Sequence, residues 1–288
     1  MNLEEIYEKA SKYDFNSLDI CSKDEAIMLF ICHIKDISKN KYYIRKNEIV
    51  LDEYETKTLF EYLNKLIYKK IPIQYIIGEV ALFNETYIVN ESVLIPRQDT
   101  EILIEKAIEY INRDNLKEGL DLCSGSGAIG ISVCNNSNIN SMHFIDISKD
   151  ALEVTKKNII KNKVAQDTLC INSDLFENIM TSEYKYDIII SNPPYIPTED
   201  IDNLSIYVKS EPIIALDGGK TGLFFYEKII NEARNYLNNN GYIMFEIGYD
   251  QMQDITNLFG NYKEYEIVEK VKDLNSNDRV IICRFHKI

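Results

Sequence analysis

Apolar residues in the first part of the chain recur at helical spacing. Lys23–Ile37 is apolar on most of its sides, as a buried helix is, and Leu59, Leu63 and Leu66 share one face of a second helix. Pro72 closes this region, because proline interrupts a helix. The pattern predicts a small helical domain over residues 1–72.

Residues 73–98 carry a different pattern and connect this domain to the rest of the chain. Glu79–Val89 reads as two short strands, which predicts a β-hairpin with its turn at Asn84 and Glu85. Asp99 and the two residues after it form a typical helix start. We therefore expect a linker over residues 73–98 and a second domain over residues 99–288.

From Lys117 onward, short apolar runs alternate with helical patterns. The predicted strands are Gly119–Cys123, Met142–Ile145, Thr168–Ile171, Ile188–Ile190 and Tyr242–Ile247. The predicted helices are Ala128–Cys134, Lys149–Lys161, Phe224–Leu237 and Gln251–Phe259. This order predicts an α/β fold, with a parallel sheet covered by helices on both faces.

The C-terminal residues break the alternation. Tyr265–Lys272 and Arg279–Phe285 are both strand-like, and no helix fits the polar segment between them. We expect them to form an antiparallel hairpin at the sheet edge. Together with the five strands before it, this hairpin gives a mostly parallel seven-stranded sheet.

The composition limits the classes of partner. The chain is 45% hydrophobic and 27% charged, which is ordinary for a globular protein, and its formal net charge is −14. Affinity for nucleic acid depends mainly on Lys and Arg that neutralise phosphates, so this acidity disfavours broad contact with a nucleic-acid backbone. We expect no direct nucleic-acid partner.

The cysteines, histidines and N-terminus indicate a reducing compartment. The six cysteines and three histidines are dispersed without CxxC or HExxH spacing, so the sequence predicts free thiols and no metal site. The first residues are acidic where a signal peptide would be basic. The densest apolar stretch, Ala26–Cys32, is shorter than the roughly 20 residues that span a bilayer. We expect a soluble cytoplasmic protein with no membrane partner.

A glycine-rich turn follows the first predicted strand of the sheet. Its glycines allow close approach of a ligand, and the helix after it offers free N–H groups. Asp146 ends the next strand, where a carboxylate can accept both hydroxyls of a ribose. Nicotinamide cofactors and S-adenosylmethionine both use such a turn, while tight packing alone would also explain the glycines and helix capping would explain Asp146. The turn residues are Cys123, Ser124, Gly125, Ser126 and Gly127.

Three features favour S-adenosylmethionine. The first is the antiparallel C-terminal hairpin, which belongs to the methyltransferase variant of this architecture. The second is Asp174, which can accept a hydrogen bond from an adenine amino group while Leu175 or Phe176 packs on the ring. Asp174 could instead cap the turn Leu175–Ile179. The third is a tetrapeptide that suits an NH2 acceptor: Asn192, Pro193, Pro194 and Tyr195.

This tetrapeptide, which we call the elbow, directly follows the apolar run Tyr186–Ser191. Its prolines stiffen the chain at a strand's carboxyl end, where open α/β sheets place ligands. We expect the Asn192 side-chain oxygen and the Pro193 carbonyl to accept one N–H each from a planar amide, with Tyr195 packed on it and Asn192 also near the cofactor. An ordinary strand-ending turn is the alternative.

With these residues in place, the chain resembles the release factor glutamine methyltransferases, a family of protein-(glutamine-N5) methyltransferases. The likeness runs from about Pro72 to the C-terminus, in the family's order. It comprises Pro72–Gly78, Leu94–Glu101, Asp146–Ser148, Asp174–Phe176, Ser191–Pro197, Glu211–Pro212, Ala215–Gly219, Glu246–Gly248 and Asp278–Val280.

The resemblance implies a Rossmann-like class I methyltransferase domain preceded by a helical substrate-recognition domain. It implies S-adenosylmethionine as cofactor and, as acceptor, the glutamine of the Gly-Gly-Gln motif in peptide-chain release factors. We expect Arg97, Thr100 and Glu101 to line the opening of the site. The alternative is that Asp99 or Thr100 caps a helix and Arg97 forms a surface ion pair.

One position departs from the family's pattern. The family's loop usually reads Gly-Thr-Gly-Ser-Gly, and Cys123 stands where its first glycine would be. A side chain there predicts a negative φ. Cys123 is also a candidate for oxidative inhibition, and we expect cofactor binding to survive because Gly125 and Gly127 remain.

Other readings stay open on the sequence. An adenine-N6 DNA methyltransferase would use the same tetrapeptide, but it calls for a basic groove. A ribosomal-protein glutamine could be the acceptor. A nicotinamide-dependent oxidoreductase would use the GxGxxG at Gly125–Gly130, and an inactive binding module would explain Cys123.

Overall fold

The computed structural model describes residues 1–15, 21–180 and 184–288. The chain divides into two compact units. The first comprises Met1–Gly78 and Leu204–Ser210, and the second comprises Glu79–Asn203 and Glu211–Ile288. No helix in these described residues is long and apolar enough to cross a membrane.

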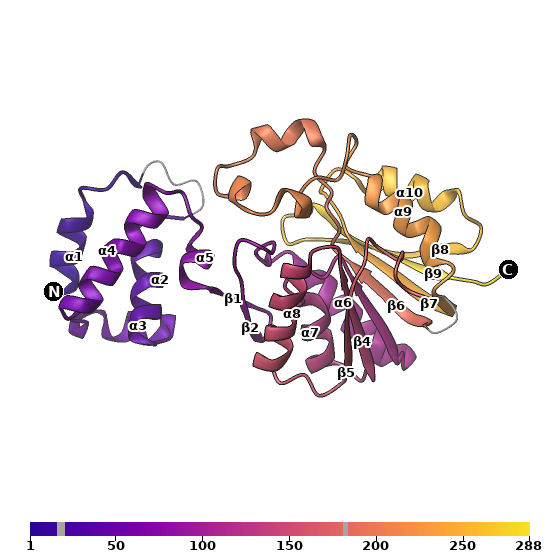
Figure 1. Cartoon of the computed structure of the whole chain (residues 1–288), viewed down its shortest axis with the longest axis horizontal. Coiled ribbons are helices and arrows are strands. Elements are labelled where there is room, and N and C mark those ends of the chain that lie inside the picture. The colour runs from indigo at the N-terminus through magenta and orange to yellow at the C-terminus, as the bar shows by residue number, and fades with distance from the viewer. Residues whose placement is uncertain (16–20, 181–183) are drawn as a thin grey trace. The chain divides into compact units, whose positions relative to one another are not determined.

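The first unit is helical (Figure 1). Its helices are α1 (Leu3–Ala10), α2 (Lys23–Lys35), α3 (Lys39–Arg45), α4 (Glu53–Ile67) and α5 (Ile73–Ile77), with the 3-10 turns η2 (Lys46–Glu48) and η4 (Val208–Ser210). Polar side chains start four of them, because Asn2, Ser22, Ser38 and Asp52 each accept a backbone N–H of the first helical turn.

Leu59, Leu63 and Leu66 of α4 are buried together in the core of this unit, on the single helix face that their spacing predicts. The sequence pattern predicts a division at residue 72, whereas the compact unit runs to Gly78 and includes Leu204–Ser210. Tyr207 holds that distant segment in place: its ring is buried, and its hydroxyl donates to the Leu66 carbonyl at 3.1 Å.

The second unit starts with a hairpin of β1 (Glu79–Leu82) and β2 (Glu85–Ile88). Its turn is Phe83 and Asn84, so the predicted turn at Asn84 and Glu85 was wrong by one residue. Glu85 instead pairs with Leu82 as the first residue of β2. Glu101 fixes the observed turn, because its carboxylate accepts the Phe83 N–H at 2.8 Å.

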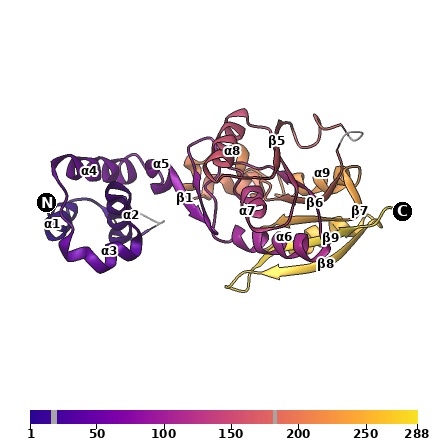
Figure 2. The ribbon, with the colours of Figure 1, turned by 90° about the horizontal axis from the view of Figure 1, so that it is seen from below.

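A seven-stranded sheet organises the rest of this unit in the order β5-β4-β3-β6-β7-β9-β8. Strands β3 to β7 pair in parallel, and the C-terminal hairpin adds β9 antiparallel to β7, with β8 at the edge (Figure 2). The predicted mixed sheet is therefore confirmed. The strands are β3 (Glu118–Leu122), β4 (Ser141–Asp146), β5 (Asp167–Asn172), β6 (Tyr186–Ser191), β7 (Leu237–Glu246), β8 (Tyr265–Lys272) and β9 (Asp278–Phe285).

Helices cover both faces of the sheet (Figure 1). They are α6 (Thr100–Asp114), α7 (Ala128–Asn136), α8 (Lys149–Lys161), α9 (Phe224–Ala233) and α10 (Met252–Gly260), with the 3-10 turns η3 (Thr198–Asn203) and η5 (Ile213–Ala215). The helix predicted over Phe224–Leu237 was too long. It ends at Ala233, and Leu237 instead pairs with Tyr186 as the first residue of β7.

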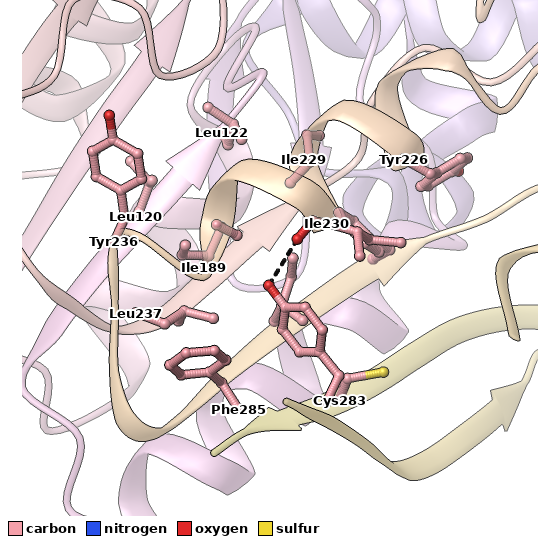
Figure 3. Packing of buried hydrophobic residues seen from close by; sticks show 14 of the residues in the cluster. Leu120, Leu122, Ile189, Tyr226, Ile229, Ile230, Tyr236, Leu237, Cys283 and Phe285 are labelled. Atoms are coloured by element: carbon pink, nitrogen blue, oxygen red, sulfur yellow. Dashed lines mark hydrogen bonds between the residues drawn. The ribbon is translucent and has the colours of Figure 1, made fainter. Parts of the chain in front are cut away.

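Alternate residues of β6 serve the two halves of the core. Ile189 packs with α9 and α10, whereas Ile188 and Ile190 pack with α6 and α7. Figure 3 shows Ile189 in the same core cluster as Ile229 and Ile230 of α9. All three isoleucines of the strand are completely buried, and each contributes about 2–3 kcal/mol to stability. This two-sided burial explains why the strand reads as a continuous apolar run.

Candidate active site

A cavity of about 300 Å³ opens at the carboxyl ends of β3, β4, β5 and β6. Parallel strands bring the segments after them to one edge of the sheet, so residues far apart in the sequence meet there. From the sequence-predicted sites, the cavity lining includes Arg97, Thr100, Cys123, Ser124, Gly125, Ser126, Asp146, Asp174, Leu175, Asn192 and Pro194. Gly127, Pro193, Tyr195 and Glu101 do not line it.

The glycine turn has the backbone that its glycines allow. Gly125 and Gly127 have φ values of +54° and +77°, in the left-handed region that glycine enters readily. A Cβ on Gly127 would lie 2.7 Å from the Thr155 methyl carbon, so that position excludes a side chain. A Cβ on Gly125 would meet nothing within 4 Å, and this leaves its backbone open to a ligand.

Asp146 supports this turn. One carboxylate oxygen accepts the Gly125 N–H and the other accepts the Ser148 N–H, each at 2.8 Å. Burial raises the pKa of Asp146, and these backbone hydrogen bonds oppose the rise. Asp146 is not the cap of α8, because Ser148 holds that position and accepts the Ala151 N–H.

Cys123 has a φ of +62°, so the expected negative φ was wrong. The backbone keeps the left-handed geometry that a glycine would adopt freely, and the cysteine side chain adopts it under strain. Burial raises the pKa of the Cys123 thiol above its ordinary value, and Asp146 adds to the rise. Since the thiolate is the reactive form, this environment argues against Cys123 as an oxidation-sensitive thiol.

Two buried polar atoms beside the turn lack partners among the described residues: the Ser124 Oγ and one oxygen of Asp121. The other Asp121 oxygen accepts the Gly130 N–H at 2.9 Å, at the start of α7. Burial raises the pKa of Asp121 to about 8. Asp121 was not among the sequence-predicted site residues, although a lone carboxylate within the apolar run before the glycines was a signal for it.

Asp174 and Leu175 approach the cavity from the end of β5. The Asp174 backbone carbonyl accepts the Glu177 N–H at 3.1 Å. The Asp174 carboxylate forms no hydrogen bond with the described residues. Phe176 stacks on Tyr236 inside the core, with ring centroids 4.5 Å apart. Of the two side chains considered for an adenine ring, Leu175 is therefore the one at the cavity.

Asn192 and Pro194 bring the elbow to the cavity, while Pro193 is buried next to them. The Tyr195 side chain packs against the core, and its backbone carbonyl accepts the Gln251 amide at 3.0 Å. Burial raises the pKa of Tyr195 to about 12. Within the described part of the chain, nothing donates a hydrogen bond to the Asn192 side-chain oxygen or the Pro193 carbonyl. Both oxygens are free to accept one.

Arg97 and Thr100 line the cavity, as expected. The alternative interactions proposed from the sequence, a surface ion pair of Arg97 and a helix cap, differ from those in the structure. Arg97 pairs with the buried carboxylate of Glu211, so this is not a surface pair. Asp99 occupies the N-cap position of α6, but its side chain makes no capping hydrogen bond and instead pairs with Arg279 at 3.1 Å. Glu101 holds the hairpin turn and stays outside the cavity lining.

Glu246 is the second buried carboxylate near the site that was not predicted from the sequence as a site residue. It ends β7, only 1% of it is exposed, and its Oε2 has no partner among the described residues. Burial raises its pKa to about 7, while Thr100, Arg279 and the Asn192 amide act in the opposite direction. The signal was a carboxylate at the end of an otherwise apolar strand.

A metal centre has no support in the described ranges, which contain no group of three or more His, Cys, Asp or Glu side chains that could hold an ion.

Solved structures establish the fold class. A methyltransferase from Pyrococcus furiosus has a TM-score of 0.52 at 18% identity and covers 82% of this chain and 100% of its own. A ribosomal protein L11 methylase from Lactobacillus delbrueckii subsp. bulgaricus has a TM-score of 0.50 at 18% identity, with 69% and 84% covered. At these identities the likeness concerns architecture alone.

Sequence relatives establish the family. The Methyltransferase small domain family matches residues 98–207. A release factor glutamine methyltransferase of Clostridium botulinum is 38% identical and covers 87% of this chain and 88% of its own. Those of Bacillus cereus and Thermodesulfovibrio yellowstonii are 35% and 36% identical, and each comparison covers at least 96% of both chains. These relationships exclude the nicotinamide oxidoreductase and the inactive binding module. The protein is an enzyme, and it belongs to the release factor glutamine methyltransferase family.

Proposed function

We propose that this protein transfers a methyl group from S-adenosylmethionine to the side-chain amide nitrogen, N5, of the glutamine in the Gly-Gly-Gln motif of peptide-chain release factors. One observation carries the proposal. The Asn192 side chain, with an oxygen free to accept a hydrogen bond, lines the same cavity as the glycine turn and Asp146.

The residues of the cavity fit S-adenosylmethionine. The Ser124 hydroxyl and the open backbone at Gly125 suit its amino-acid end. Asp146 suits its ribose, because each carboxylate oxygen has a second lone pair beyond the one that accepts a backbone N–H. Asp174 would accept the adenine amino group, and Leu175 would cover the ring. When bound, the cofactor supplies a methyl group on a positively charged sulfur.

The elbow would hold the glutamine amide. An amide nitrogen is a poor nucleophile, because its lone pair is delocalised into the carbonyl. If the Asn192 oxygen and the Pro193 carbonyl each accept one N–H, they orient that nitrogen and stabilise the positive charge that develops on it. Good orientation supplies roughly 7–11 kcal/mol of a barrier. Tyr195 would anchor the elbow through its packing in the core and its bond from Gln251.

The acceptor is proposed from the named relatives, which are release factor glutamine methyltransferases. We assign residues 1–72 to substrate recognition, residues 73–98 to a linker and residues 99–288 to methyl transfer. A separate recognition domain suits a short target loop on a large protein, because it adds contact area away from the reacting group.

Mass spectrometry of purified release factor tests this function. After incubation with the protein and S-adenosylmethionine, we expect a single added methyl group on the glutamine of Gly-Gly-Gln. Parallel reactions contain ribosomal proteins or an adenine-containing DNA oligonucleotide with labelled cofactor. Label in either of those, with unmodified release factor, would assign the enzyme to one of the two alternative substrates.

A further inference from the structure

Glu246 and Asn192 are neighbours at the carboxyl ends of two adjacent strands. Strands β6 and β7 are parallel, and Ser191 lies opposite Phe245 in their register. The residues that come next along the chain are Asn192, which directly follows β6, and Glu246, which is the last residue of β7. They therefore lie side by side at the carboxyl edge of the sheet. Asn192 lines the cavity, whereas Glu246 is buried and does not. Glu246 thus forms a second layer next to Asn192.

The two ends of the Asn192 amide are chemically opposite. Its oxygen only accepts hydrogen bonds and its NH2 only donates them. A carboxylate beside it can only accept, so it is satisfied by the NH2 end alone. The unpartnered Oε2 of Glu246 is such an acceptor. With the NH2 end turned toward Glu246, the Asn192 oxygen is the atom left to face the cavity.

We propose that Glu246 is a positioning residue: as a carboxylate it accepts the Asn192 Nδ2–H and holds the Asn192 oxygen toward the cavity, so that the site takes substrates presenting an NH2 group. This inference rests on the proposed function. A protonated Glu246 would donate instead, and the reversed Asn192 would then meet the substrate NH2 with its own NH2.

The groups around Glu246 determine the pH range in which it is ionised. Thr100 from α6 and Arg279 from β9 favour the charged form, while Asp99 opposes it. Tyr195 and Tyr226 also face it, and their phenols stay protonated near neutral pH because burial raises the pKa of each. Burial of Glu246 itself dominates and raises its pKa to about 7. The proposed switch therefore operates close to neutral pH.

The test compares Glu246→Gln with the wild type on release-factor glutamine. The wild-type kcat should rise about tenfold between pH 6 and pH 8, following a group that titrates near pH 7. In Glu246→Gln, kcat at pH 8 should fall at least tenfold and no longer depend on that titration. The affinity for S-adenosylhomocysteine should stay within about twofold, because Glu246 does not line the cavity.

Glu269→Gln is the matched control. This carboxylate of β8 bonds Lys106 and Tyr110 on α6, outside the cavity lining, and its loss should leave kcat and the pH profile unchanged. A double variant tests whether Glu246 acts through Asn192. Combining Glu246→Gln with Asn192→Ala should lower kcat no further than Asn192→Ala alone.

Three results would overturn the inference: a wild-type pH profile in Glu246→Gln, losses that add fully in the double variant, or a Glu246→Gln protein that loses S-adenosylhomocysteine. A wild-type enzyme that leaves release-factor glutamine unmodified overturns the proposed function, and the inference with it. If the wild-type enzyme methylates release-factor glutamine and any of the three results is found, only the inference about Glu246 is rejected and the proposed function stands.

Discussion

Arg97 and Glu211 form an ion pair at the edge of the cavity, although 114 residues separate them. The Glu211 side chain is only 2% exposed, whereas that of Arg97 is 40% exposed. The second carboxylate oxygen of Glu211 accepts the Ile95 N–H at 2.9 Å. One buried carboxylate therefore holds both the backbone at Ile95 and the side chain of a cavity residue.

Replacing Glu211 with alanine should destabilise the second unit by about 2 kcal/mol, because it leaves the Ile95 N–H without its acceptor and Arg97 without its partner. Urea unfolding measures this loss. The control is Glu105→Ala, an exposed position of α6, which should leave the unfolding midpoint unchanged. Equal midpoints for the two variants would show that Glu211 contributes nothing to stability.

Asn192→Ala should lower kcat about 100- to 1,000-fold, because it removes an oxygen aimed at developing charge. The affinity for S-adenosylhomocysteine should change by no more than a few-fold. Methyl transfer from labelled cofactor and titration calorimetry give the two quantities. Asn135→Ala on α7 removes an amide of the same size that bonds Asn162, and it should retain full activity. A large loss of cofactor affinity in Asn192→Ala would contradict the role assigned to Asn192.

The Cys123→Gly variant should be more stable than the Cys123→Ala variant. Both substitutions remove the thiol, but only glycine relieves the strain of a left-handed φ, which is worth about 1–2 kcal/mol. In thermal unfolding, the midpoint temperature of Cys123→Gly should be higher than that of Cys123→Ala. At Lys157, an exposed position within α8, the order should reverse, because glycine is the weaker helix former. The same order at both positions would mean that the backbone at Cys123 is unstrained.

Glu246 should also make stability depend on pH. Its pKa rises from the model-peptide value of 4.5 to about 7 on folding, so the folded state favours the protonated form. The stability contributed by protonated Glu246 is fully present below pH 4.5 and is lost as the pH rises through about 7.

Glu246→Gln should therefore match the wild type near pH 4.5 and exceed its stability at pH 8 by on the order of 3 kcal/mol. Unfolding of both proteins across this range gives the difference, and groups that titrate in both cancel from it. A difference that stays constant with pH would show that Glu246 keeps an ordinary pKa.

Local pattern predicted much of this architecture. The runs around Leu120, Phe144 and Ile189 identified their strands, and the glycine turn and the prolines after Ser191 identified two sides of the cavity. Where the local pattern was ambiguous, the predicted end of an element was wrong. Phe224–Leu237 reads as one helix, but pairing with Tyr186 takes Leu237 into a strand.

The sequence by itself determined which segments form strands and helices, because each element needs its own spacing of apolar residues. It also placed polar and glycine residues at the strand ends. Only the tertiary structure decided which side chains meet: Glu246 beside Asn192, Glu211 with Arg97, and Leu175 rather than Phe176 at the cavity. Strand order and register bring these pairs together across long separations, and burial shifts the pKa of their carboxylates. Neither effect is encoded in the spacing of neighbouring residues.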